Sequence, residues 1–425
     1  MSIHHGHALD SGDDEPQRIA ITLQASASQN HPAGQSVARR FARRVSLFYG
    51  STFGIAGIHL PFFPVWLKAI GLDVAWIGLI IATPSLCRFT VQPFATAAAE
   101  RHHVLRGTMI ALAFASAGGF ALLGLLHQPL ILLAVYLLIA CVWTPITPLT
   151  DGYALKGVTR HGLDYGRMRL WGSASFMIAA LVGGWLLDLI DPRNVIWIIV
   201  AAAVLSALVS LGLPALDEAA MTPAQPHAQA APARASSLLR APLFLAIVAA
   251  SALIQGSHAA YYAFASITWQ NAGYGGFAVA ALWSLGVIAE IVVFLLSPRL
   301  TLSPTTMVLI GAASAVVRWI LTALEPPLAL LTAVQLLHGL TFGITQVGIV
   351  ALMVRAVPHH KLASAQGYMV ALQGGVTSLV MVGSGLIYAR FGEGVYYAMA
   401  AMALAGGAVM AAARSRLERA APATN

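Results

Sequence analysis

Long apolar runs recur along the whole chain, and each is about as long as the hydrocarbon core of a membrane is thick. A helix needs about 20 predominantly apolar residues to cross that core. Six runs precede the middle of the chain, at about residues 46–68, 74–95, 107–127, 129–150, 167–189 and 193–213. Six follow, at about 242–270, 277–297, 305–324, 328–350, 364–389 and 394–413. The sequence therefore predicts an all-α polytopic membrane protein with twelve transmembrane helices in two six-helix bundles.

The segments outside these runs divide the chain. The first of them mixes His, Asp, Ser, Gln and Ala without apolar periodicity, which is typical of a disordered tail. The central one is rich in Pro, Ala and Gln, as expected of a flexible linker. We predict a disordered cytoplasmic tail over 1–44, an N-terminal bundle over 45–213, a cytoplasmic linker over 214–240, a C-terminal bundle over 241–413 and a cytoplasmic tail over 414–425.

The basic residues predict the orientation in the membrane. With the N-terminus inside, the inner segments hold 19 of the 24 Lys and Arg residues. The outer loops hold only Lys68, Arg193 and Arg390, and Arg88 and Arg318 lie within spans. Because short cytoplasmic loops carry the excess of basic residues, we expect both termini in the cytoplasm and the protein in the bacterial inner membrane.

The formal charge of +8 could suggest nucleic acid, but the arginines are scattered among short loops rather than gathered on a basic face. We find no nucleophile, metal or nucleotide motif, so an enzyme is not expected, and without a phosphate-binding loop an ion gradient must drive any transport. The His4, His5 and His7 cluster lacks other ligand types nearby. Cys87 and Cys141 lie within spans and predict no disulfide framework. No cofactor or metal is expected.

We single out five ionisable residues inside predicted spans: Arg88, His258, Glu290, Arg318 and His338. Charged groups in lipid are costly unless they are paired or hydrated, so such residues are candidates for function. The alternative is an internal salt bridge that only fixes helix packing. Five groups inside apolar bundles favour a wet cavity or mutual pairing, and the adjacent Tyr261 and Tyr262 offer ring faces there.

The segment over residues 145–176 places charges between two apolar runs. Asp151 closes the first run and Arg169 opens the second, with Trp171 close by. Phe176 follows Arg169 by seven residues and so shares its helix face. A guanidinium beside aromatic rings suits an anionic or ring-containing ligand. Asp151 and Arg169 could instead be ordinary helix-end residues at the cytoplasmic mouth.

Twelve spans, a long central linker and the AAAERHHVLRG turn after the second span resemble the major facilitator superfamily, although the turn lacks the glycines and aspartate of the usual loop motif. PLTDGYALK followed by DYGRMRLWGS is similar to the lactose permease branch. That resemblance implies sugar-recognising roles for Asp151 and Arg169, and buried counterparts in Glu290, Arg318 and His338. It also implies that Arg169 and Glu290 lie close together.

Two departures count against a sugar: Phe176 replaces the branch's stacking tryptophan, and Thr341 replaces its proton-carrying glutamate. QGSHAAYYAF, WQNAGY, LWSLGVIAEI and RLWGS more closely resemble permeases of the 3-phenylpropionate type. This resemblance extends from the first span to the twelfth. It implies an organic acid with an aromatic body as the substrate.

We therefore expect a proton-coupled symporter that imports a small organic acid, with an aromatic carboxylate favoured, by rocking of two bundles. The alternatives are a sugar or nucleoside symporter, a drug exporter, or a non-transporting sensor or assembly protein on a carrier fold. We expect a functional monomer that binds no nucleic acid. The proton-coupling candidates are Glu290, His338 and Asp151, and the substrate-binding candidates are Arg88, Asp151, Arg169, Trp171, Phe176, His258, Tyr261, Tyr262 and Arg318.

Overall fold

The computed structural model of the chain describes residues 32–102, 104–216, 238–358 and 361–419, and within these ranges every regular element is a helix. The predicted histidine cluster near the N-terminus and most of the predicted linker lie outside the described residues. The N-terminal half contains α2 (Pro32–Ala69), α3 (Val74–Thr90), α4 (Gln92–Arg101), α5 (Leu105–Leu123), α6 (Pro129–Trp143), α7 (Ile146–His161), α8 (Tyr165–Leu187), η1 (Pro192–Asn194) and α9 (Val195–Ser210).

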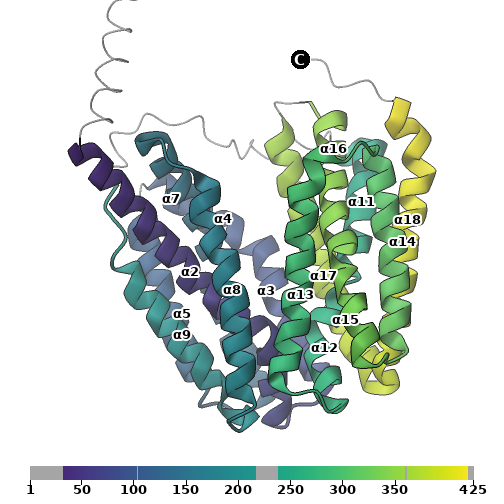
Figure 1. Cartoon of the computed structure of the whole chain (residues 1–425), viewed down its shortest axis with the longest axis horizontal. Helices are drawn as coiled ribbons and strands as arrows, with labels where there is room; N and C mark the ends of the chain where they lie inside the picture. The colour runs from purple at the N-terminus through teal and green to yellow at the C-terminus, as the bar shows by residue number, and fades with distance from the viewer. Residues whose placement is uncertain (1–31, 103, 217–237, 359–360, 420–425) are drawn as a thin grey trace, which may run out of the picture.

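The C-terminal half repeats this plan with η2 (Leu238–Arg240), α11 (Pro242–Gly256), α12 (Ala259–Asn271), α13 (Gly276–Leu296), η3 (Ser297–Arg299), α14 (Pro304–Ala323), α15 (Leu328–Leu336), η4 (Gly339–Ile344), α16 (Thr345–Ala356), α17 (Leu362–Phe391), η6 (Gly392–Gly394) and α18 (Val395–Arg419). In Figure 1 the two halves stand side by side, with α2 to α9 on the left and α11 to α18 on the right.

Nine helical stretches of the described chain are long and apolar enough to cross a membrane, and α3 with α4 forms a tenth that is bent by 43°. One of the nine, Ala365–Arg419, contains both α17 and α18. Counting those two separately, and adding the 38-residue α2, gives twelve spans. The all-α membrane fold is therefore confirmed, and the helices are consistent with twelve predicted spans.

Two helices extend further than the sequence predicted. The tail was expected to end at residue 44, but α2 begins at Pro32. Phe41 is 1% exposed and stacks on Tyr153, with 5.4 Å between ring centroids, so packing holds this part of α2 in place. Likewise α18 continues to Arg419, past the expected end at residue 413, because Leu417 is buried in the core of the C-terminal half.

Helix breaks follow the local sequence. The bend between α3 and α4 lies at Val91, two residues before Pro93, and α6 gives way to α7 at Pro145. Proline removes a backbone donor and clashes with the preceding turn, which favours such breaks. In the C-terminal half, α11 and α12 are interrupted at Ser257 and His258 without a proline.

The two halves meet mainly along the helix pairs α3 with α17 and α8 with α13, and α2 also contacts α12. Small residues permit close approach at both, because a side chain at Gly78 would meet the backbone of Gly385, and one at Gly184 would meet the carbonyl of Gly276. The halves converge at the lower end of Figure 1 and diverge toward the end where α2 begins and α18 ends.

Candidate functional site

A buried polar cluster lies in the C-terminal half, centred on Arg318 of α14, whose side chain has no exposed surface. Its Nη1 donates to Nδ1 of His338 at 2.8 Å and to Oγ1 of Thr341 at 3.2 Å, and its Nη2 donates to Oε1 of Gln335 at 3.1 Å. The ring faces of Tyr261 and Trp319 lie 4.6 Å and 4.7 Å from its central carbon. Neutral partners and cation–π contacts thus replace the water that Arg318 loses.

The hydrogen bonds determine where the proton of His338 lies. Arginine can only donate, so Nδ1 of His338 must accept and the ring proton sits on Nε2. That nitrogen points toward Glu290, whose Oε2 lies 3.7 Å away. Glu290 is partly exposed, with 24% of its side-chain surface accessible. A proton on Nε2 of His338 is therefore placed next to a carboxylate that solvent or a ligand can reach.

His258 extends the same network. Its Nδ1 lies 3.3 Å and 3.2 Å from the carbonyl oxygens of Ile254 and Gln255, which only accept, so this nitrogen carries the proton. Its Nε2 then accepts from the hydroxyl of Thr341 at 3.1 Å, and Thr341 in turn accepts from Arg318. Thr341 thus joins His258 to Arg318. It is also a position at which the sequence departs from the lactose permease branch.

The turn after His338 is a π-helix, η4, which interrupts α15 and α16. Single π turns inside helices are frequent at functional sites. Gly339 makes the turn possible, since a Cβ there would lie 2.6 Å from the carbonyl oxygen of Ala289 on α13. The backbone of η4 is therefore pressed against α13, the helix that carries Glu290.

The N-terminal half contributes Arg88 of α3, which is exposed and interacts electrostatically with Tyr136 of its own half and Tyr262 of the other. Tyr262 also interacts with Glu290 and Arg318. Arg88 therefore lies at the junction of the halves, near the polar cluster of the C-terminal half. Seven of the residues singled out from the sequence are brought together here: Arg88, His258, Tyr261, Tyr262, Glu290, Arg318 and His338.

Sequence reasoning missed His59 of α2, which is 7% exposed and makes a 2.9 Å hydrogen bond between its Nε2 and the hydroxyl of Tyr136. Its ring stacks on Phe63 at 4.6 Å and meets the edge of Trp143 at 4.7 Å. Because Tyr136 interacts with Arg88, His59 lies behind the arginine site. The sequence feature that could have identified His59 was its position as a histidine inside the first apolar run.

Asp151 and Arg169 form a second, separate polar group. The hydroxyls of Tyr49 and Tyr165 donate to Oδ1 of Asp151 at 2.6 Å and 3.0 Å. Arg169 lies over the ring of Phe53, 4.0 Å from its centroid. The expected contact between Arg169 and Glu290 is not formed in this conformation, because the guanidinium packs on α2 while the carboxylate faces His338.

Trp171 and Phe176 are not the rings beside Arg169. Trp171 is 61% exposed and lines a groove with Leu205 and Val209 of α9. It follows Arg169 by two residues, which places it on nearly the opposite face of the helix. The carbonyl of Phe176 faces Gly57, where α8 packs closely on α2.

Comparisons with known proteins agree with this architecture. The family model described as MFS_1 like family matches residues 42–399. The chain is 33% identical over 373 residues to a probable 3-phenylpropionic acid transporter of Escherichia coli (strain K12), covering 85% of this chain and 95% of that protein.

Solved structures are similar at lower identity. The nucleoside transporter NupG superposes with a TM-score of 0.78 at 16% identity, covering 88% of this chain and 98% of that one. A D-xylose-proton symporter superposes with a TM-score of 0.64 at 14% identity, covering 87% and 97%. At these identities the likeness shows the fold alone.

Proposed function

The chain belongs to the MFS_1-like family of the major facilitator superfamily and is a multi-pass membrane transporter, and from this premise we propose that it imports a small aromatic carboxylate together with protons. In this proposal the two halves rock about a central site, which is exposed alternately to each side of the bacterial inner membrane. Both termini lie in the cytoplasm, and one chain is the working unit.

The observation that carries the proposal is the arrangement around Tyr262, which interacts electrostatically with Arg88, Glu290 and Arg318. Two arginines and one carboxylate thus lie around Tyr262, and the hydrogen-bond partners of Arg318 are all neutral, with ring faces as its other neighbours. A monocarboxylate would balance this charge with charge-assisted hydrogen bonds. A neutral sugar would leave the positive charge unmatched in a low-dielectric site.

The aromatic body of the substrate is supported by the two tyrosines that interact with Arg88, one from each half. Tyr136 stands in the N-terminal half with His59, Phe63 and Trp143 behind it. Tyr262 stands in the C-terminal half and stacks toward Trp283, with 6.1 Å between ring centroids. Such rings favour an aromatic ligand through stacked and edge contacts. The relative named for 3-phenylpropionic acid agrees with this substrate class.

Coupling to protons is supported by Glu290 and His338. A histidine can exchange protons near neutral pH, and here its Nε2 proton faces the Glu290 carboxylate at 3.7 Å. In the proposed cycle Glu290 takes up the coupled proton when the substrate carboxylate occupies the arginines. With Glu290 protonated and the arginines paired with the substrate, fewer unpaired charges are enclosed while the halves change conformation, which lowers the free energy of that step.

The test is uptake by proteoliposomes of purified full-length protein, with labelled 3-phenylpropionate, benzoate, lactose and a nucleoside supplied in parallel. We expect accumulation of 3-phenylpropionate above the equilibrium level only when an inwardly directed proton gradient is imposed. A sodium gradient at equal pH should not drive it. Accumulation of lactose or the nucleoside instead, or no dependence on the proton gradient, would replace this proposal with one of the other carrier functions.

A further inference from the structure

A groove of about 970 Å³ lies on the N-terminal half where α2 passes between α8 and α9. It is lined by Ser46 and Leu47 of α2, Trp171 and Ser175 of α8, and Leu205 and Val209 of α9. The exposed fractions of Leu47, Trp171 and Leu205 are 50%, 61% and 58%. Figure 1 shows α2 and α8 crossing next to one another in this half. None of the residues that line the groove belongs to the polar cluster around Arg318.

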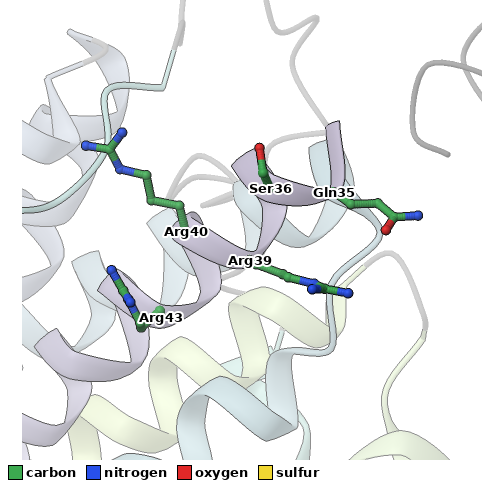
Figure 2. A pocket seen from close by; sticks show the side chains of 5 residues that line it. All are labelled: Gln35, Ser36, Arg39, Arg40 and Arg43. Atoms are coloured by element: carbon green, nitrogen blue, oxygen red, sulfur yellow. The ribbon is translucent and has the colours of Figure 1, made fainter. Parts of the chain in front are cut away.

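The groove is basic at one end. Arg43 lines both the groove and a second cavity of about 530 Å³ formed with Gln35, Ser36, Arg39 and Arg40. Figure 2 shows Arg40 and Arg43 extending to the same side of α2, with Arg39 on the opposite side. The ion pairs found in the described part of the chain do not involve these arginines, whereas Arg167 at the rim pairs with Asp164 at 3.5 Å.

We propose that these adjoining cavities bind one anionic phospholipid, with its phosphate on Arg40 and Arg43 and an acyl chain in the groove against Leu47, Trp171 and Leu205. The site is separate from the substrate site and does not depend on the proposed transport function. Basic pockets between transmembrane helices commonly hold anionic headgroups. Here the basic cavity and the apolar groove adjoin one another, because Arg43 lines both.

Two features favour a phospholipid over a second copy of the chain or a free anion. The basic and apolar parts lie end to end, which matches the headgroup and acyl chain of a lipid. Trp171 lines the groove, and tryptophan is enriched at the level of lipid headgroups. In the predicted orientation the four arginines of residues 39–44 lie at the cytoplasmic leaflet. Each basic side chain near an anionic leaflet raises the binding affinity about fivefold.

The test uses the full-length protein in nanodiscs and the fluorescence of Trp171, quenched by lipids that carry brominated acyl chains. At equal mole fraction, brominated phosphatidylglycerol should quench several-fold more of the Trp171 signal than brominated phosphatidylcholine. The Trp171 signal is obtained as the fluorescence of the protein minus that of the Trp171→Phe variant. In Arg40→Gln/Arg43→Gln the preference should fall to about one. The matched control Arg299→Gln/Arg416→Gln removes two arginines from the other half and should retain it.

Three results would overturn the site: equal quenching by the two lipids, an unchanged preference in Arg40→Gln/Arg43→Gln, or an equal loss in the control. Ser46→Trp tests the apolar part with the arginines intact, since the added ring fills the groove, and it should abolish retention of phosphatidylglycerol in native mass spectrometry. Soluble glycerol phosphate should not displace the lipid. If it does, the cavity binds a phosphate and the acyl groove is not part of the site.

Discussion

Arg318 shows how this protein keeps a charge inside a membrane bundle. Its three hydrogen-bond partners, His338, Thr341 and Gln335, are neutral, and two ring faces cover it. A buried ion pair would satisfy it fully and leave no need for an anionic ligand. The carboxylate of Glu290 lies on the other side of His338, 3.7 Å from its Nε2. Both features agree with the proposed exchange of an anion and a proton at this site.

We expect Glu290→Gln to exchange substrate across the membrane but to lose uphill accumulation. The amide cannot take up the proton, yet it keeps the shape of the side chain next to His338. Counterflow and proton-driven uptake in proteoliposomes measure the two activities. Glu325→Gln, an exposed loop carboxylate, is the matched control and should accumulate substrate normally. Normal accumulation by Glu290→Gln would assign the proton to His338 or Asp151.

We expect Arg88→Gln to lose the preference for 3-phenylpropionate over its neutral amide. Hydrogen bonds to charged groups contribute about 1.5 to 3 kcal/mol, so the preference should fall by roughly ten- to a hundredfold. Binding calorimetry with the acid and the amide measures it. Arg169→Gln should keep the preference, since Arg169 packs on Phe53. The reverse pattern would place the substrate carboxylate on Arg169.

At the scale of elements, one contact between the halves stands out at the closed end. Asp188 follows α8, and its carboxylate accepts from the backbone N–H groups of Gly276 and Phe277 at 2.5 Å and 3.0 Å. These N–H groups begin α13, so the end of one helix caps the start of another from the opposite half. Lys68 also bonds to Asn271 near this end. Such caps contribute about 1 kcal/mol, which is small enough to be broken in each transport cycle.

We therefore expect Asp188→Ala to shift the population toward the conformation that is open at this end. A loss of about 1 kcal/mol changes the ratio about fivefold. Spin labels at Gln128 and Glu325, in loops of the two halves after α5 and α14, report the distance in a background without Cys87 and Cys141. Asp73→Ala removes a cap within one half, where Asp73 binds Ala75 and Trp76, and should leave the distances unchanged. An equal shift in both variants would contradict the role of Asp188.

At the scale of the whole molecule, the substrate is expected to join the two halves through Arg88 and the cluster around Arg318. A ligand that binds only the folded protein stabilises it by about 2.7 kcal/mol at a hundredfold excess over Kd. We expect 3-phenylpropionate to raise the unfolding temperature of the purified protein, while its amide at the same concentration should have little effect. Thermal unfolding followed by tryptophan fluorescence measures this. An equal rise with the amide would show that the carboxylate is not recognised.

The sequence by itself determined the membrane class, because lipid accepts only segments whose apolar length and internal hydrogen bonds suit its core. It also located Arg88, Glu290, Arg318 and His338, since ionisable residues within apolar runs are conspicuous without any knowledge of packing. In the structure Arg318 and His338 are buried, and Arg88 and Glu290 interact with neighbouring side chains. All four lie inside helices that the hydropathy pattern already predicted.

Only the tertiary structure decided which groups meet. His59 pairs with Tyr136 across 77 positions, and Tyr49 with Asp151 across 102. Such pairs depend on how each helix is rotated about its axis, which apolar runs leave undetermined because lipid and protein faces are both hydrophobic. For the same reason Trp171 was predicted beside Arg169, whereas packing of α8 on α2 turned it into the groove. The π turn after His338 likewise lies where Gly339 packs against α13, a contact that hydropathy alone does not predict.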